Sequence, residues 1–359
     1  MALLGSRRRR MWRLSIVAFA LLVGYLVATR LSQGASKHTQ AVRYSDDIPS
    51  LPTPNAPHAA ASCFVFVTRT ASLTKVRRTM FDVEKRFNER HAYPYVFLSE
   101  LPFSDAFKRA VRKMTAAPVH FAAIDAWQHP PWIVQTHDSS AWRHVLRFWA
   151  GPIALHPALR PFKYFWRLEP GAHYTCDIAY DPFRLMQDHR TSYGFAISLE
   201  AAVPYAGPTL WASALEFIHS SLYNDSSHGN SLGWLMHPTF KAYNRCEFLT
   251  NFELVDLDFM RSAPYQRLFD FFDRKGGFYY ERWTDASIRS LAVAMLLRQD
   301  QVRWFDDIGY THDLSKNCPA ATESQMRCHC DPAKSSHLLP MSCSARWKTQ
   351  ATNIPWHHI

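Results

Sequence analysis

Two short apolar segments on either side of an amphipathic one constrain the fold of this chain most strongly. CFVFVTR (63–69) and YPYVFLSE (93–100) have the length and composition of buried strands. Between them, residues 73–90 carry apolar side chains at helical spacing, which predicts a helix with one apolar side formed by Leu73, Val76, Met80, Phe81, Val83 and Phe87. A strand, a helix and a second strand in this order form a βαβ unit, so the sequence predicts a parallel sheet.

The rest of the chain continues the alternation of strands and helices. Strands are predicted over 164–170, 193–199 and 302–308, and helices over 210–223, 265–275 and 284–298. The chain has 359 residues, 47% of them hydrophobic and 14% aromatic, which excludes a disordered protein and allows a sizeable core. These features predict one α/β domain over residues 62–359.

The N-terminus carries a targeting signal. An apolar run over residues 12–29 follows a cluster of arginines, and about 17–25 apolar residues span a bilayer as a helix. The arginines predict a cytosolic tail (1–11), a transmembrane anchor (12–29) and a lumenal remainder that begins with a Pro-, Ala- and Ser-rich stem (30–61). A cleaved signal peptide is the alternative.

The formal net charge of +11 comes partly from these arginines, so nucleic-acid binding does not follow from it. Basic residues elsewhere in the chain favour an anionic or phosphate-bearing ligand.

All seven cysteines lie beyond the predicted anchor. An oxidising lumen favours disulfide bonds, and an odd number leaves one cysteine free or paired with another chain. The cluster over 318–343 could alternatively bind zinc with His329, although it lacks a paired C-x-x-C. Asn224-Asp225-Ser226 is a plausible N-glycosylation acceptor and fits the same compartment.

Acidic residues follow the predicted strand at 164–170. Pro170 restricts Glu169 to an extended conformation, so this carboxylate is presented where the strand ends. Asp177 and Asp181 follow, and several carboxylates could converge where the sheet meets its loops, a common place for metals and phosphates. A solvated acid at a strand end is the alternative for Glu169.

A second acidic group lies in YNRCEFLTNFELVDLDFMRS, residues 243–262. An alternating strand would make Glu253 half-buried, the environment that shifts the pKa of an acid, base or nucleophile. An ion pair with an arginine is an equally compatible role. Asp256 and Asp258 form a D-x-D, which can hold Mg²⁺ or Mn²⁺ but also occurs often by chance.

Two further segments contain residues suited to ligand binding. In GGFYYERWTDASIRS (276–290), paired glycines permit a close approach of backbone to ligand, and the aromatic residues can stack on a base or sugar. Thr284 or Asp285 could cap the following helix. His312 follows a predicted strand and a turn at Gly309; a loop histidine is usually solvated, but one that faces a carboxylate suits Mn²⁺.

Four of these segments resemble, in the same order, the signature blocks of the fungal Golgi α-1,2-mannosyltransferases, glycosyltransferase family 15. They are YFWRLEPGAHYTCDIAYDPF (164–183), the 243–262 segment, GGFYYERWTDAS (276–287) and FDDIGYTHDLSKNCP (305–319). Residues 64–108 also look like the family's first βαβ segment, and the resemblance extends from about Cys63 to Cys343.

The resemblance implies a type II Golgi membrane protein with a GT-A-like α/β domain and a mixed, mainly parallel sheet. It implies transfer of mannose from GDP-mannose to a mannose of an N- or O-linked glycan, with retention and with Mn²⁺. Carried over by position, it makes Glu169 and His312 the metal ligands, Glu253 the acid beneath the anomeric carbon, and Asp285 a polar catalytic or acceptor-site residue. Tyr280 and Trp283 are then expected to contact donor or acceptor, and Asp256 and Asp258 are expected to be structural.

The chain departs from the family pattern in SAWRHVLRFWAGPIA, residues 140–154. Trp142 replaces an active-site tyrosine, Leu146 replaces a cysteine, and Trp149-Ala150 replaces an Asn-Ser pair. The retained Arg143 and Arg147 are expected to bind the diphosphate or orient the acceptor. The preceding segment, 123–140, is shortened and rewritten.

Two alternatives remain at this point. The first is a catalytically impaired relative that acts as a glycan-binding or assembly subunit, which the substitution at Trp142 favours and the retention of Glu169, Glu253 and His312 disfavours. The second is another metal-dependent lumenal enzyme of phosphate transfer or hydrolysis, for which the sequence offers no phosphate-cradling glycine motif.

Overall fold

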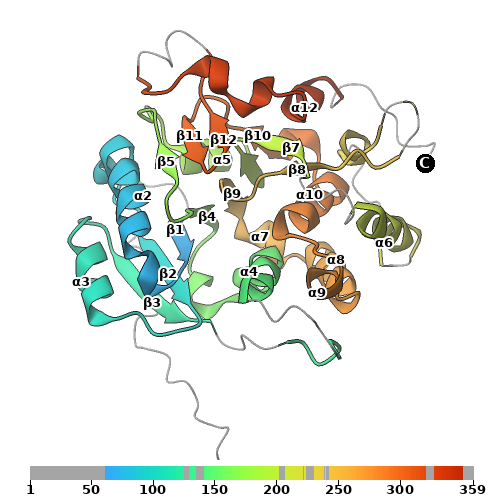
Figure 1. Cartoon of the computed structure of the whole chain (residues 1–359), viewed down its shortest axis with the longest axis horizontal. Helices are drawn as coiled ribbons and strands as arrows, with labels where there is room; N and C mark the ends of the chain where they lie inside the picture. The colour runs from blue at the N-terminus through green and yellow to red at the C-terminus, as the bar shows by residue number, and fades with distance from the viewer. Residues whose placement is uncertain are drawn as a thin grey trace, which may run out of the picture. The chain divides into compact units, whose positions relative to one another are not determined.

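The computed structural model describes residues 61–124, 129–134, 141–201, 207–220, 222–223, 230–237, 239, 242–320 and 327–350 (Figure 1). The predicted tail and anchor, the stem up to residue 60, and the predicted glycosylation site at Asn224 lie outside the described residues. Of the helices that are described, none is both long and apolar enough to cross a membrane.

A seven-stranded sheet runs through the centre of the described structure. Its strands are, in spatial order, β10 (Val302–Trp304), β6 (Tyr193–Phe195), β9 (Glu253–Asp256), β4 (Tyr164–Arg167), β1 (Ser62–Val67), β2 (Tyr95–Ser99) and β3 (Val119–Ala123). β9 pairs antiparallel with β4 and β6, and the other neighbours pair in parallel. The prediction of a mixed, mainly parallel sheet is therefore confirmed.

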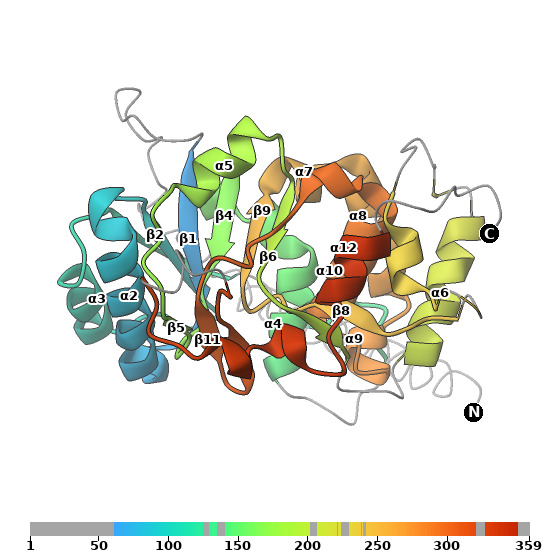
Figure 2. The same ribbon diagram turned by 90° about the horizontal axis from the view of Figure 1, so that it is seen from above.

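Two smaller sheets accompany the central one. β12 (Ser315–Asn317), β11 (Tyr310–His312) and β5 (His173–Tyr174) form an antiparallel sheet of three strands. β7 (Ser198–Glu200) and β8 (Cys246–Phe248) form an antiparallel pair. β5 follows β4 and β7 follows β6 along the chain, and Figure 2 shows β5 and β11 side by side below the central strands.

Helices cover both faces of the sheet, because its strands are apolar on both sides. The helices are α2 (Leu73–Arg86), α3 (Asp105–Arg112), α4 (Ala141–Ala150), α5 (Pro182–Asp188), α6 (Gly207–His219), α7 (Leu257–Arg261), α8 (Ala263–Arg274), α9 (Gly277–Tyr280), α10 (Asp285–Leu296) and α12 (Ser344–Gln350). Phe64 and Phe66 of β1 join the core cluster with α2, α3 and α5. Cys63 and Val65 join the other cluster, with α4, α8 and α10 (Figure 1).

The prediction for the apolar side of the first helix is wrong at one position. Val76, Met80 and Val83 of α2 are buried, but Phe81 is 57% exposed. Phe81 is one residue after Met80, and a step of one residue turns a helix by about 100°, which carries the ring to the flank of the buried stripe.

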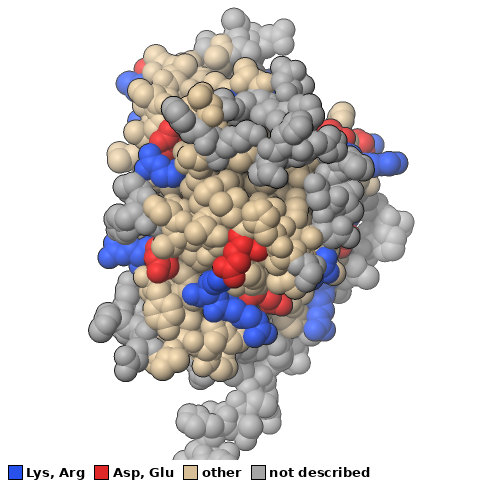
Figure 3. Space-filling view, turned by 90° about the vertical axis from the view of Figure 1, so that its right-hand side faces the viewer, with Lys and Arg blue, Asp and Glu red and all other residues tan. Residues whose placement is uncertain are grey.

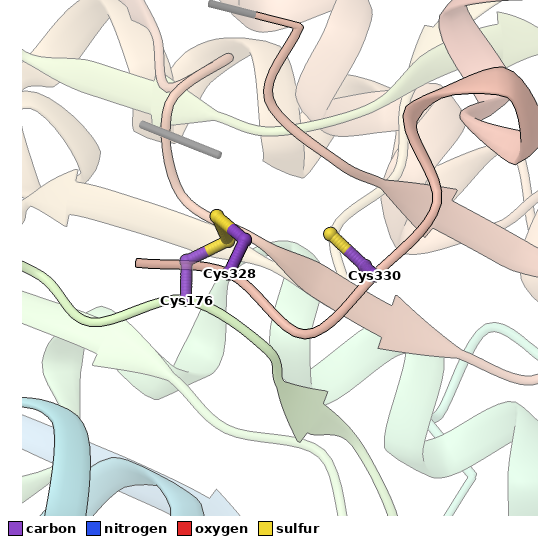
Figure 4. Close-up of side chains that lie close together, drawn as sticks. All are labelled: Cys176, Cys328 and Cys330. Atoms are coloured by element: carbon purple, nitrogen blue, oxygen red, sulfur yellow. A yellow bond between two sulfur atoms is a disulfide. The ribbon is translucent and has the colours of Figure 1, made fainter. Parts of the chain in front are cut away.

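Six of the seven cysteines form disulfide bonds, as an oxidising compartment predicts. The bonds join Cys176 to Cys328, Cys246 to Cys343 and Cys318 to Cys330, while Cys63 is free and buried. Figure 4 shows that Cys330 lies beside the Cys176–Cys328 bond; the three sulfurs lie within 4.8 Å of one another. Because all of these sulfurs are in disulfides, the zinc alternative has no thiolates available.

Asp256 and Asp258 have structural partners, as the resemblance implies. Asp256 caps α7 by accepting a hydrogen bond from the Asp258 backbone N–H at 2.9 Å. Lys163 Nζ lies 3.2 Å from Asp256 and 2.8 Å from Asp258. The two carboxylates therefore share a cation that the protein itself supplies.

The surface beside α6 carries charges of both signs (Figure 3). A hollow of about 440 Å³ there is lined by Leu222, Arg267, Asp270, Phe271, Arg274 and Lys275. Its cations are engaged locally: Lys275 pairs with Glu216 at 2.5 Å, and Arg267 donates to the Leu222 carbonyl. The lining includes none of the residues predicted above to bind a ligand.

The Cys176–Cys328 bond requires a glycine at position 309. A Cβ at Gly309 would lie 2.1 Å from Cys176 Sγ and 2.5 Å from Thr175 Oγ1, so Gly309→Ala should prevent this bond from closing. Mass spectrometry after alkylation of the unfolded protein should count three free thiols in the variant, against Cys63 alone in the wild type.

Gly207→Ala is the matched control, because its Cβ would make contacts no shorter than 3.4 Å. A single free thiol in both variants would contradict the packing described for Gly309.

Candidate active site

The pairing of β4 with β9 places Arg167 directly opposite Glu253. Side chains alternate along a strand, and the next residues inward, Phe165 and Val255, belong to the core cluster with α4 and α10. Arg167 and Glu253 therefore point toward the same helices. The sheet register thus introduces one buried cation and one buried acid on the same face.

Arg167 is the centre of the charged cluster on this face. Its Nε donates to Glu169 Oε1 at 2.7 Å, its Nη1 donates to Asp285 Oδ2, and Nη1 lies 3.9 Å from Glu253 Oε1. Its guanidinium also lies 4.0 Å from the centre of the Trp149 ring. Burial disfavours the charged form, but Asp285, Glu169 and Glu253 together outweigh it and raise the pKa of Arg167.

Glu253 is completely buried, with no accessible surface. Arg289 Nε donates to its Oε2 at 3.1 Å, and its Oε1 has no hydrogen-bond partner in the part of the chain that is described. Burial raises the pKa of Glu253, and Arg289 and Arg167 oppose that rise without cancelling it. The sequence allowed two roles for Glu253, an acid with a shifted pKa or a partner in an ion pair with an arginine. The structure shows both, since Glu253 forms the ion pair and its pKa is raised.

Asp285 begins α10 but does not cap it. Thr284 is the cap and accepts from the Ser287 backbone N–H at 3.1 Å. The Asp285 carboxylate instead accepts from Arg167 and, at 2.8 Å, from the Thr250 hydroxyl. Arg167 thus joins Glu169, Glu253 and Asp285, three acids that are far apart in the sequence.

A fourth acid, Glu247, lies beside this cluster. Its Oε2 accepts from the Ser287 hydroxyl at 2.9 Å. Burial raises its pKa to about 7, and the neighbouring Asp285 adds to that rise. Sequence analysis did not select Glu247, because a single acid in a short strand gives no pattern.

The pairing of β5 with β11 places His312 opposite the turn that carries Glu169. β5 and β11 pair antiparallel, with Tyr174 opposite Tyr310 and His173 opposite Thr311. Continuing this register places His312 opposite Ala172, at the end of the turn that begins at Glu169 and closes with the Ala172 N–H on the Glu169 carbonyl.

Thr79 of α2 fixes this turn. Its hydroxyl oxygen lies 2.9 Å from the Ala172 carbonyl and 3.1 Å from the Glu169 carbonyl, so its single O–H is shared between them, and it accepts from the Gly171 N–H at 3.0 Å. Gly171 has φ of +93°, a conformation that side chains disfavour. The position of Glu169 thus depends on a threonine and a glycine that carry no charge.

Asp177 and Asp181 do not join this group. Asp177 pairs with Arg86 at 2.9 Å. Asp181 caps α5 and accepts from the Tyr93 hydroxyl at 2.6 Å. The expected convergence of carboxylates at the end of β4 is therefore wrong for these two residues, because the loop carries both toward the α2 side of the sheet.

The groups around the Glu169 turn suit a hard divalent cation. Glu169 uses Oε1 for Arg167 and keeps 18% of its side chain exposed. Asn251 places Nδ2 3.2 Å from His312 Nδ1, and its Oδ1 is buried with no partner among the described atoms. Turning this amide by 180° would let Oδ1 accept from His312 Nδ1–H, leaving the Nε2 lone pair to bind a metal. A carboxylate oxygen and an imidazole held in this way are a suitable pair for Mn²⁺.

Of the predicted aromatic contacts, two lie on the surface and one does not. Trp142 is 57% and Tyr280 is 47% exposed, and the Tyr280 hydroxyl accepts from the Val134 N–H at 3.1 Å. Trp283 is 2% exposed and donates its indole N–H to the Thr209 hydroxyl at 3.2 Å.

The two arginines of α4 are both held within the protein. Arg147 donates Nε and Nη2 to the two carboxylate oxygens of Asp273, each at 2.7 Å. Burial lowers the pKa of Arg147, but Asp273 more than compensates, so the net change is upward. Arg143 is 8% exposed.

Sequence analysis missed several residues of this site: Arg167, Thr250, Asn251 and Arg289. A signal for two of them was present, because Arg167 interrupts an aromatic strand and Arg289 interrupts an apolar helix. A cation inside such a segment needs a buried acid as partner. Thr250 and Asn251 gave no signal, since their roles depend on tertiary neighbours.

Comparisons with known proteins identify the family and the fold. The family described as glycolipid 2-alpha-mannosyltransferase matches residues 29–352. O-glycoside alpha-1,2-mannosyltransferase homolog 2 of Schizosaccharomyces pombe is 36% identical over 303 residues, 79% of this chain and 80% of the relative.

Two solved structures share the fold. The mannosyltransferase Ktr4p of Saccharomyces cerevisiae in complex with GDP has a TM-score of 0.75 and 32% identity, covering 86% of each chain. Core-mannan synthase A of Aspergillus fumigatus, in an Mn/GDP form, has a TM-score of 0.71 and 32% identity over 77% of this chain and 82% of that one. These likenesses confirm the predicted GT-A-like α/β fold.

The raised pKa of Glu247 predicts a pH-dependent gain in stability for Glu247→Gln. The folded protein holds this proton up to about pH 7, whereas the unfolded chain releases it near pH 4.5, so stability falls as the pH rises between these values. Glutamine keeps an acceptor for Ser287 and carries no charge. The unfolding free energy of the variant minus that of wild type should therefore be larger at pH 8 than at pH 4, by up to about 3 kcal/mol.

Urea unfolding at both pH values measures this difference. Glu216→Gln is the control, because the Glu216 side chain is 57% exposed and its charge stays hydrated. The account fails if Glu247→Gln changes the unfolding free energy equally at pH 4 and pH 8.

Proposed function

Because this chain belongs to the glycolipid 2-alpha-mannosyltransferase family, we propose that it transfers mannose from GDP-mannose to a mannose of an N- or O-linked protein glycan. The proposed product has an α-1,2 linkage, and the configuration at the anomeric carbon is retained. The observation that carries this proposal is the joining of Glu169, Glu253 and Asp285 through Arg167. His312 lies opposite the end of the Glu169 turn when the β5–β11 register is continued.

Mn²⁺ is the proposed cofactor, held by Glu169 and His312 with Asn251 orienting the imidazole. When bound, the ion stabilises negative charge on the diphosphate as GDP leaves. The Mn/GDP form of the Aspergillus fumigatus relative supports the assignment of both the metal and the nucleotide. Thr79 supplies the rigidity by holding the turn that carries Glu169.

Arg167 binds only part of each neighbouring carboxylate. It holds one oxygen of Glu169 and one of Asp285, which leaves the other oxygens for a cation or a sugar hydroxyl. Glu253 supplies the negative charge that opposes the positive charge of an oxocarbenium-like transition state. Since Glu253 has no accessible surface, the donor sugar reaches it only when neighbouring side chains move apart.

The acceptor is proposed to bind at the exposed aromatic side chains. Trp142 and Tyr280 are 57% and 47% exposed, and an aromatic ring on the surface can stack on the apolar face of a mannose ring. The family resemblance implies a tyrosine at position 142, and the tryptophan found there keeps an aromatic ring but has no hydroxyl. We assign the acceptor preference of the chain to this difference.

The location that we propose is the Golgi membrane, as a single-pass type II protein. The arginine-flanked apolar run at 12–29, the Pro-rich stem and the sequon at Asn224 support it. The three disulfide bonds are consistent with a lumenal domain.

Mannose transfer by the full-length chain in detergent micelles tests the proposed function. Incubation with GDP-mannose, Mn²⁺ and methyl α-mannoside should give an α-1,2-linked dimannoside, identified by mass spectrometry and NMR. Glu253→Gln should lower the rate by about a hundredfold or more, as expected for loss of a group that stabilises transition-state charge. EDTA should abolish transfer, and Mn²⁺ should restore it.

Glu216→Gln, which changes an exposed acid on α6, should leave the rate unchanged. If the folded protein neither extends the mannoside nor hydrolyses GDP-mannose and also fails to bind GDP, a glycan-binding or assembly role replaces the proposed transferase. Binding of GDP without turnover would point to a different acceptor. If Glu253→Gln is as active as wild type, the role given to Glu253 is wrong.

A further inference from the structure

Arg289 is the buried arginine of α10, and all sides of its guanidinium are in use. Nε donates to Glu253 Oε2 at 3.1 Å, Nη1 donates to the Tyr265 hydroxyl, and Nη2 donates to the Trp149 carbonyl at 2.9 Å. Arg289, Tyr265 and Glu253 have no accessible surface, and Trp149 has 1%. This arginine therefore cannot turn away without breaking several buried hydrogen bonds.

Arg167, the other cation near Glu253, is bound differently. It lies 3.9 Å from Glu253 Oε1, beyond hydrogen-bond distance, and its donors serve Glu169 and Asp285. Glu169 is partly exposed, so Arg167 has a partner that a ligand can reach. Among the described residues, Arg289 alone donates a hydrogen bond to the Glu253 carboxylate.

The end of α4 supports both Arg289 and its partner Tyr265. The Trp149 carbonyl accepts from Arg289, and the Ala150 carbonyl accepts from the Tyr265 hydroxyl at 2.6 Å. The Trp149 ring also lies beneath Arg167. One short segment of α4 thus holds both arginines that face Glu253.

We propose that Arg289 is a positioning residue for the transfer reaction, which holds Glu253 as an ionised carboxylate with Oε2 anchored and Oε1 directed toward Arg167. This inference rests on the proposed function, in which the charge of Glu253 stabilises the transition state. Arg289 does not contact substrate; it acts through Glu253. It extends the site beyond the residues predicted from the sequence.

The surroundings of Glu253 explain why such a residue is needed. The charged and titratable groups that face it are Arg289 and Asp285 from α10, Arg167 from β4, Tyr265 from α8 and Tyr193 from β6. Burial raises the pKa of Glu253, and Asp285 adds to the rise. Only the two arginines favour the charged form, so removing Arg289 leaves one cation that already serves two other acids.

Two variants of the full-length chain test the proposal through the pH dependence of kcat/KM. Arg289→Met removes the charge and every donor. The acid limb of the profile, where kcat/KM falls as Glu253 becomes protonated, should therefore move to higher pH by about one unit or more, because the pKa of Glu253 rises. Arg289→Lys keeps a charge, so its acid limb should lie closer to that of wild type.

Two controls separate positioning from packing. Tyr265→Phe removes one partner of Arg289 and leaves its charge, so the acid limb should stay in place. Arg261→Met removes an arginine that donates to the carbonyls of Ala154, Leu159 and Phe162, so it should cost stability without moving the limb. An unmoved limb in Arg289→Met, or an equal shift in Arg261→Met, would overturn the proposal.

A second readout does not require activity. Infrared difference spectra against wild type at pH 7 should show an additional protonated carboxyl band in Arg289→Met, beyond the one that Glu247 gives in every variant, and the double variant Arg289→Met/Glu253→Gln should lack this additional band. If wild type transfers no mannose but this band behaves as expected, the proposed function fails while the control of Glu253 ionisation stands. If transfer occurs and the band is the same in wild type and Arg289→Met, the role of Arg289 is wrong. Should Arg289→Met not fold, Arg289→Gln, which keeps a hydrogen-bond donor and removes the charge, takes its place: the same upward shift and additional band are expected, and their absence would overturn the proposal.

Discussion

The site depends on the contact of Arg167 with three carboxylates. Without this cation, Glu169, Glu253 and Asp285 would bring like charges together where little water remains, and such an arrangement is strongly unfavourable. Arg167 is positioned by the pairing of β4 with β9, which is part of the central sheet. The chemistry proposed here is therefore built on the register of two strands rather than on a flexible loop.

The two halves of the site are fixed by different means. The metal half rests on a turn held by Thr79 and Gly171 and on the short pairing of β5 with β11, close to the Cys176–Cys328 bond. The sugar half rests on buried ion pairs from β4, β9 and α10. Backbone and disulfide constraints position the proposed metal ligands, whereas charge pairing positions the acid proposed to face the sugar. Arg167 belongs to both halves, because it contacts Glu169 and Asp285 at once.

Much of the fold followed from the sequence, because the apolar strands and amphipathic helices are long enough to show their periods. Glu169, Glu253, Asp285 and His312 could be selected because they stand in blocks that resemble a family. Asn251 could not, since its partner comes from a distant segment. Arg289 gave only the signal of a cation inside an apolar helix, and its partners could not be read from the sequence. Phe81 was misplaced because neighbouring apolar residues on a helix do not all face the core. Asp177 and Asp181 were misplaced because sequence proximity does not fix the direction of a loop.

The central claim is that the turn at Glu169 and the strand ending at His312 form one metal site next to the Arg167 cluster. Anomalous diffraction from crystals of this protein grown with Mn²⁺ and GDP tests it most directly. The account predicts a manganese peak in contact with the Glu169 carboxylate, the His312 imidazole and the diphosphate. A peak at Asp256 and Asp258 instead, or a bound nucleotide with no metal near Glu169, would contradict it.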